Sequence, residues 1–170
     1  MSIIVVNLQR EILTTVSMPQ NPYIGRNNAK IDKGGRVYIP SLFRKAMEGV
    51  THFVARIDPE DKYLMVFTET GWNSMMADIL SHANPLDPDD ADLIMQINDE
   101  ALFLDIDEQG RFQIPKKLAE HLEFKGEVTF VSIEDHFGIW GKERYDNRRA
   151  SRASLMDSVA AFNKKHNINQ

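Results

Sequence analysis

A ten-residue stretch that occurs twice constrains this chain more than any other feature. Residues 31–40 read Ile-Asp-Lys-Gly-Gly-Arg-Val-Tyr-Ile-Pro, and residues 106–115 read Ile-Asp-Glu-Gln-Gly-Arg-Phe-Gln-Ile-Pro. Six of the ten positions are identical, whereas residue frequencies of roughly 5–9% would give about one match by chance. The chain is therefore expected to be a tandem duplication of one small unit.

Each copy predicts a glycine turn between two short strands. In the first copy, paired glycines tolerate the positive φ that a tight turn requires. Beyond the turn, Val37 and Ile39 alternate with polar positions, so the period of two directs the apolar pair inward and Arg36 outward. Pro40 ends this strand and favours the first position of a helix, and Pro115 has the same place in the second copy.

The pattern continues in each copy as a helix, a β-hairpin and a further helix. In the first copy these are expected at 41–48, at 52–57 with 63–68, and at 71–82. In the second copy the helix is expected at 115–122 and the hairpin at 127–133 with 137–140, before a helix-prone tail. Four short strands cannot bury two faces alone, so the two copies are expected to close one shared barrel. The predicted class is α+β, mainly β, with short helices and pseudo-two-fold symmetry. The expected divisions are an N-terminal arm at 1–22, a first repeat at 23–82, an acidic helical connector at 83–100, a second repeat at 101–145 and a C-terminal helix and tail at 146–170.

Charge is distributed unevenly along the chain, although the net charge is only −5 over 170 residues. Residues 26–47 hold six basic residues and one acid, and residues 84–108 hold nine acids and no base. Residues 142–152 return to five basic residues and two acids. An acidic molecule with a basic face is therefore expected, and the distribution carries more information than the sum.

Several function classes find no support in the residues. The chain has no cysteine, which excludes disulfides, thiol catalysis and Cys-ligated zinc. No stretch approaches the roughly 20 apolar residues that span a bilayer, so no membrane partner is expected. The five histidines are scattered, and neither a P-loop nor a nucleophile elbow is present. The prediction is a protein that is not an enzyme and needs no metal or cofactor.

The repeated pattern, Asp-x-x-x-Arg followed by an apolar residue, any residue and Ile-Pro, resembles the MraZ family. The flanking segments 23–25 and 137–140 and Trp72 extend the resemblance. It implies tandem AbrB/SpoVT-type swapped-hairpin domains in a bacterial transcription regulator that is cytoplasmic and nucleoid-associated. Such proteins are expected to bind double-stranded DNA at repeats in the promoter of the division and cell-wall gene cluster, and to form ring-like homo-oligomers.

The motif residues support two compatible interpretations. In the structural one, Asp32 and Asp107 accept backbone N–H groups in their turns and pair with the arginine four residues later. In the functional one, which the resemblance favours, the turns project Arg36 and Arg111 into a DNA groove, where arginine can contact guanine O6 and N7. The remaining structural positions are Gly35, Gly110, Pro40 and Pro115.

Further basic residues are candidates for phosphate contacts, which position a protein without reading bases. These are Arg26, Lys30, Lys33 and Arg44, and the alternative for them is a solvated basic face. The first turn is expected to contact DNA more strongly, because Lys33 lies in a basic stretch and Glu108 in an acidic one. The basic run 142–152 either contacts DNA or, as the charge pattern favours, pairs with the acidic middle of a neighbouring subunit.

A second function of a different class stays open. The same fold can serve as a ring-forming scaffold with weak or no DNA binding, and the acidic segment 84–108 and the net charge of −5 favour that alternative. The salt dependence of DNA binding, with Arg36→Ala as the variant, separates the two functions.

Overall fold

The computed structural model describes residues 25–44, 47–84, 86–133 and 136–168. The expected N-terminal arm, residues 1–22, lies outside these residues, and so do Tyr23 and Ile24 of the motif. Within the described part, the chain forms eight β-strands and six α-helices. Every strand pair is antiparallel, which confirms the predicted α+β class.

The first copy of the unit follows the predicted order of elements. Thr68 begins the long helix that ends the copy, because its hydroxyl accepts the Gly71 N–H at 3.1 Å. The elements are β1 (Arg26–Lys30), β2 (Arg36–Tyr38), α2 (Ser41–Arg44), β3 (His52–Ile57), β4 (Leu64–Phe67) and α3 (Glu69–His82).

The second copy repeats this order after one intervening helix, α4 (Pro88–Asp99). Asp87 begins α4 by accepting the Asp89 N–H at 3.0 Å, and Pro88 occupies the first helical turn, where no N–H is needed. The second copy consists of β5 (Leu102–Asp105), β6 (Arg111–Gln113), α5 (Lys116–His121), β7 (Glu127–Ile133), β8 (His136–Gly141) and α6 (Lys142–Ser151), and α7 (Leu155–Lys165) follows.

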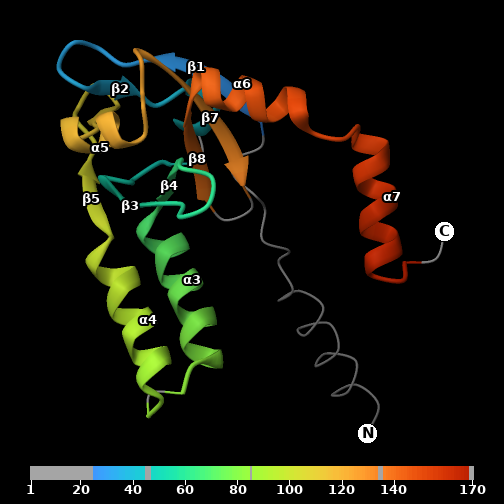
Figure 1. Ribbon diagram of the computed structural model, residues 1–170. Coiled ribbons are helices and arrows are strands. Elements are labelled where there is room, and N and C mark those ends of the chain that lie inside the picture. Colours follow the sequence, from blue (N-terminus) through green and yellow to red (C-terminus); the bar gives the residue numbers. More distant parts are fainter. Residues whose placement is uncertain (1–24, 45–46, 85, 134–135, 169–170) are drawn as a thin grey trace, which may run out of the picture.

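The two copies exchange strands with each other. The large sheet has the order β1-β7-β8-β4-β3-β5, and the small sheet consists of β2 and β6 (Figure 1). Consequently the first strand of each copy pairs with the third strand of the other copy, as β1 with β7 and β5 with β3. Neither copy can complete its own sheet, so the duplicated units fold as one interlocked body.

Strand register shows the pseudo-two-fold symmetry directly. In the small sheet Val37 pairs with its equivalent Phe112, which lies 75 residues further on, the spacing of the two decapeptides. In the large sheet Met65 pairs with its equivalent Gly138, which lies 73 residues further on, because the connection in the second hairpin is two residues shorter. Equivalent residues therefore face each other in both sheets, and the pseudo-two-fold axis passes through both pairs.

The sheets do not close into the expected barrel. Among the described residues, β1 and β5 remain the two edges of the large sheet. The link from β1 to β2 is a single bridge between Ile31 and Val37, and its counterpart joins Ile106 to Phe112. A single bridged residue pair at each glycine turn does not continue the hydrogen-bond ladder from one sheet to the other.

The core lies between the two sheets and the short helices. Fully buried aromatic side chains fill it, and several meet edge to face, as Phe53 does with Phe112 at 5.6 Å between ring centroids. The predicted inward pair Val37 and Ile39 is buried there. Among the described helices, none combines the length and apolar composition of a membrane-spanning helix.

Two helical arms leave this body. Helices α3 and α4 form one arm, and α6 leads into α7 in the other (Figure 1). Because these helices are longer than any strand, helix accounts for 41% and strand for 29% of the structure. The helical share is therefore larger than the mainly-β balance that the short repeated strands predict.

Candidate functional site

The first turn is organised by the carboxylate of Asp32. Its Oδ1 accepts the backbone N–H of Gly34 at 2.8 Å and that of Arg36 at 2.9 Å, and its Oδ2 accepts the Arg36 Nε–H at 2.8 Å. All three bonds span four residues or fewer, so the local sequence is enough to form them. Asp32 therefore closes the turn and orients the guanidinium beyond it.

The second turn repeats this arrangement around Asp107. Its Oδ1 accepts the N–H of Gln109 at 3.0 Å and of Arg111 at 2.9 Å. Its Oδ2 lies 2.8 Å from Nε and 2.7 Å from Nη2 of Arg111, which makes this ion pair two-pronged. The two turns thus share their backbone hydrogen bonds, but Asp32 binds one nitrogen of its arginine and Asp107 binds two.

These bonds shift the ionisation of both carboxyl groups in the same direction. The backbone N–H and guanidinium of Arg36 hold the pKa of Asp32 below its ordinary value. At the second turn the Arg111 guanidinium is the largest cause, and its hydrogen bond lowers the pKa of Asp107. The same bond raises the pKa of Arg111. Both carboxylates are therefore ionised near neutral pH.

The pairing of β2 with β6 brings both arginines to one face of a two-stranded ribbon. Arg36 lies opposite Gln113, and Arg111 lies opposite Tyr38. Alternation along each strand buries Val37 and Phe112 and leaves these four side chains on the outer face. Diagonal neighbours on such a face have Cα atoms roughly 7–8 Å apart. Both arginines also border one shallow groove that continues onto β5.

Exposure distinguishes the two arginines. The side chain of Arg36 is 48% exposed and that of Arg111 only 17%. The guanidinium of Arg111 lies 5.6 Å from the centroid of the Tyr38 ring, a cation–π contact across the ribbon. Within the described residues, the terminal nitrogens of Arg36 have no protein partner. Arg36 is therefore the more available donor.

Two residues of the site were not assigned to it from the sequence. Tyr38 and Gln113 are the polar members of the alternating strands, and Gln113 also donates to the Gly34 carbonyl at 3.0 Å across the ribbon. Arg44, a predicted phosphate contact of the first copy, lies beside the second turn, where a methyl group on Gly110 would sit 3.5 Å from its guanidinium carbon. The alternation itself could have indicated Tyr38 and Gln113, whereas nothing local links Arg44 to the second turn.

The remaining predicted phosphate contacts lie at different distances from the ribbon. Lys33 is exposed in the first turn. Lys30 lies on the edge strand β1 opposite Glu127. Arg26 lies at the other end of β1, and its guanidinium is 5.8 Å from the ring centroid of Tyr145 in α6. The structure thus groups Lys33 with the turns and directs Arg26 toward α6.

The glycine and proline positions have identifiable backbone roles. Gly35 has φ +79° and Gly110 has φ +73°, which is the left-handed region that favours glycine. The carbonyl of Pro40 accepts the Phe43 N–H and so begins α2. Pro115 precedes α5 as its N-terminal boundary residue. These residues shape the ribbon and its exits without presenting a polar side chain.

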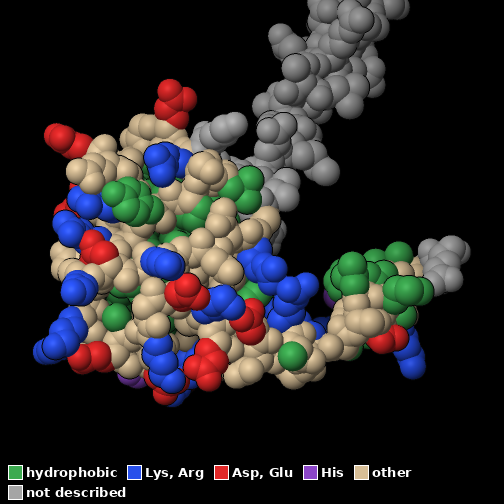
Figure 2. Space-filling view, turned by 90° about the horizontal axis from the view of Figure 1, so that it is seen from above, with side chains coloured by type: hydrophobic (Ala, Val, Ile, Leu, Met, Phe, Trp, Pro, Cys, Tyr) green, Lys and Arg blue, Asp and Glu red, His purple; other side chains and the backbone are tan. Residues whose placement is uncertain are grey.

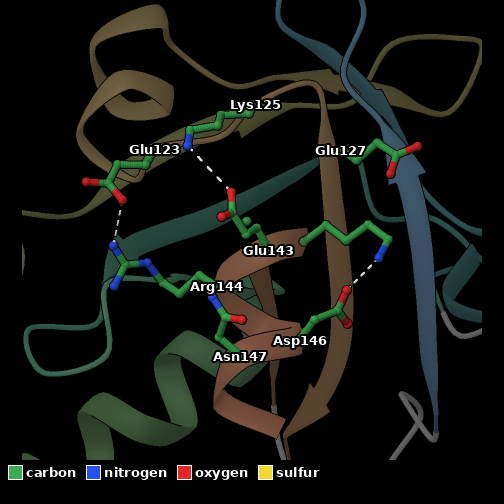
Figure 3. Close-up of a pocket in the computed structure, with 9 residues that line it drawn as sticks. Glu123, Lys125, Glu127, Glu143, Arg144, Asp146 and Asn147 are labelled. Carbon is green, nitrogen blue, oxygen red and sulfur yellow. Dashed lines mark hydrogen bonds and ion pairs between the residues drawn. The ribbon is translucent and has the colours of Figure 1, made fainter. Parts of the chain in front are cut away.

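Another surface groove lies between α6 and the segment that joins α5 to β7 (Figure 3). Its charges are matched in pairs: Arg144 lies 2.8 Å from Glu123, and Lys125 lies 3.5 Å from Glu143. These pairs fasten α6 to the body, and within the described part of the chain Glu127 is the one charged side chain of this groove without an ion pair. Among the described residues, no cluster of three or more His, Asp or Glu side chains is arranged to hold a metal ion.

The fold and the site define a class: an interlocked tandem repeat that presents two Asp-oriented arginines on one ribbon. Residues 98–164 match the family model described as "MraZ protein, putative antitoxin-like". The chain is similar to the protein named Transcriptional regulator MraZ of Phocaeicola vulgatus, with 28% identity over 73% of this chain and 82% of that protein. The protein of the same name from Hydrogenovibrio crunogenus is 28% identical over 80% of this chain and 88% of its own length. The chain is thus similar to MraZ proteins over most of its length, and the family model matches the second copy of the repeat together with α6 and α7.

Proposed function

We propose that this chain is a transcriptional regulator that binds double-stranded DNA through the outer face of the β2–β6 ribbon. Its relatives are named transcriptional regulators, which supports a regulatory and non-enzymatic role. A two-stranded ribbon fits the width of the major groove. The face offers two arginines, a glutamine and a tyrosine, and these are side chains suited to base edges and to phosphate oxygens.

The availability of Arg36 is the observation that carries this proposal. Asp32 engages its Nε alone, so both terminal nitrogens point beyond the ion pair. A guanidinium oriented in this way is pre-organised to reach guanine O6 and N7 with two donors. Arg111 gives both Nε and Nη2 to Asp107, and its guanidinium also interacts with Tyr38, so it is less available for a base or phosphate. Arg36 is therefore the principal reading residue and Arg111 the secondary one.

Basic residues around the ribbon supply sequence-independent attraction. Lys33 and Lys30 flank the first turn, and Arg44 supplies the positive charge that the second turn lacks in its own sequence. The expected targets are repeated promoter elements of the division and cell-wall gene cluster, with several copies of the chain bound side by side in a ring-like homo-oligomer. Affinity would then arise from multivalency rather than from any single turn.

A salt titration of DNA binding tests this function. The wild-type chain is expected to bind its own upstream region specifically, with an affinity that falls steeply as salt rises. Arg36→Ala is expected to abolish sequence preference while the melting temperature stays unchanged, because the side chain is half exposed. The control is Lys62→Ala, which removes a positive charge from the β3–β4 connection.

The scaffold alternative rests on the net charge of −5 and on the acidic segment 84–108, which holds no basic residue. A wild-type chain that assembles but shows no preference for its upstream region over random DNA would refute the regulatory proposal. That outcome would favour the scaffold.

A further inference from the structure

Helix α7 exposes an apolar face that the rest of the described chain leaves uncovered. None of its residues is buried. Its exposed apolar side chains follow the pattern i, i+1, i+4 and i+7, which places them on one side of a helix: Leu155, Met156, Val159 and Phe162. Figure 2 shows these side chains gathered on a lobe that stands away from the body. Such a face marks an interaction surface.

Basic residues without an ion pair flank this face at both ends. In α6, Arg144 pairs with Glu123 and Arg148 with Asp61, so those two are engaged within the chain. Among the described residues, no ion pair is found for the bases on either side of the apolar stripe: Arg149, Arg152, Lys164 and Lys165. The surface that covers α7 should therefore be apolar with an acidic border.

The other helical arm carries a surface of that kind. Exposed leucines lie near its far end, with Leu80 in the last turn of α3, Leu86 in the connection and Leu93 in α4. Residues 87–100 contain six acids and no base. Within the described residues none of these acids has an ion pair with a lysine or arginine. The α3–α4 arm thus matches α7 in both apolarity and charge.

The two surfaces cannot meet within one chain in this arrangement, because the arms stand apart in Figure 1. We propose that the apolar face of α7 docks on the α3–α4 arm of a second copy of this chain, with its basic flanks against the acidic border of that arm. This deepens the homo-oligomer of the proposed function by naming its contact surface. Because the two surfaces differ, the contact is head-to-tail. A dimer held by one such contact still has one unoccupied α7 face and one unoccupied α3–α4 arm, to which further copies can bind.

Sedimentation velocity on full-length variants tests the docking. Phe162→Asp places a charge in the apolar face, and Leu93→Asp does the same on α4. Each is expected to raise the concentration required for assembly by roughly tenfold or more, because an uncompensated charge would be buried. Ala161→Asp adds the same charge on the opposite side of α7 and should assemble as the wild type does, since 3.6 residues make one turn. Leu155→Asp repeats the test if Phe162→Asp lowers the melting temperature.

Mixing the two impaired chains separates this contact from other modes of assembly. The intact α7 of the Leu93→Asp chain can dock on the intact arm of the Phe162→Asp chain, so the mixture should form a 1:1 dimer that neither forms alone. A monomeric wild type overturns the proposal, and so does normal assembly of Phe162→Asp or of Leu93→Asp. A mixture without the dimer overturns it as well. If Phe162→Asp still binds DNA specifically, or if Arg36→Ala still assembles, then assembly and DNA binding depend on different surfaces. A failure of one proposal is then distinguishable from a failure of the other.

Discussion

The turn at Asp32 and the turn at Asp107 are built from the same local bonds but have different neighbours. In both, one carboxylate accepts two backbone N–H groups and the arginine Nε. Across the ribbon, however, Arg36 faces Gln113, whereas Arg111 faces Tyr38 and is covered by its ring. The two copies therefore share the turn itself, while one difference between them, tyrosine at position 38 and glutamine at the equivalent position 113, changes how each arginine is presented.

Glycine substitutions give the largest expected difference between the turns. A methyl group on Gly35 would lie 2.9 Å from the Ile114 carbonyl oxygen, whereas one on Gly110 would make ordinary contact with the Arg44 guanidinium. Gly110→Ala should lower the free energy of unfolding by about 1–2 kcal/mol, the strain of a left-handed alanine. Gly35→Ala should lower it by roughly 2–4 kcal/mol, because overpacking adds to that strain. Denaturant melts measure both, and equal losses would contradict the difference in packing.

Arginine substitutions test whether the exposure and pairing of each arginine determine how much it contributes to sequence-specific DNA binding. Arg36→Ala should weaken binding to the specific site by roughly 5- to 150-fold, the range for one bidentate base contact. Arg111→Ala should weaken it only a few-fold, because Asp107 already engages two of its nitrogens. Fluorescence anisotropy with specific and random duplexes measures both effects. A larger loss from Arg111→Ala would reverse the ranking of the two turns.

The charge of each turn should alter the salt dependence by a smaller amount. Lys33→Gln should reduce the slope of log affinity against log salt by about one, with little change in sequence preference. Glu108→Lys should steepen the slope by a similar amount if the second turn also approaches phosphates. Asp78→Lys, on the exposed side of α3, makes a similar charge change on the helical arm and should leave the slope near that of the wild type.

Acid should affect both turns only well below neutral pH. The folded-state pKa of Asp32 and of Asp107 is lowered relative to about 3.9 in an unfolded chain. The stability that each ionised carboxylate contributes is therefore present above about pH 4 and is lost as pH falls through the folded-state pKa. Titration of the two carboxyl carbons by NMR should give midpoints below 3.9. The Asp32→Asn and Asp107→Asn variants should lose this part of the pH dependence.

Much of the fold could be predicted because its signals are local. The strands at 52–57 and 127–133 begin and end where the sequence predicts, and the order of elements is confirmed in both copies. The helix predicted at 71–82 begins two residues earlier, at Glu69, because Thr68 caps it. The helix predicted at 41–48 is described only as Ser41–Arg44. The prediction of a closed barrel was wrong, because closure depends on hydrogen bonding between strands that are distant in the sequence, which no single segment specifies.

The sequence by itself determined the duplication, the glycine turns and the bonds that join each aspartate to the arginine four residues later. Those interactions span at most four residues, so the chain order is sufficient to specify them. Only the tertiary structure decided that β2 pairs with β6, which sets both arginines on one face and Tyr38 over Arg111. It also placed Arg44 of the first copy beside Gly110 of the second. These contacts join residues some 70 positions apart, and burial of the shared core, not local preference, selects them.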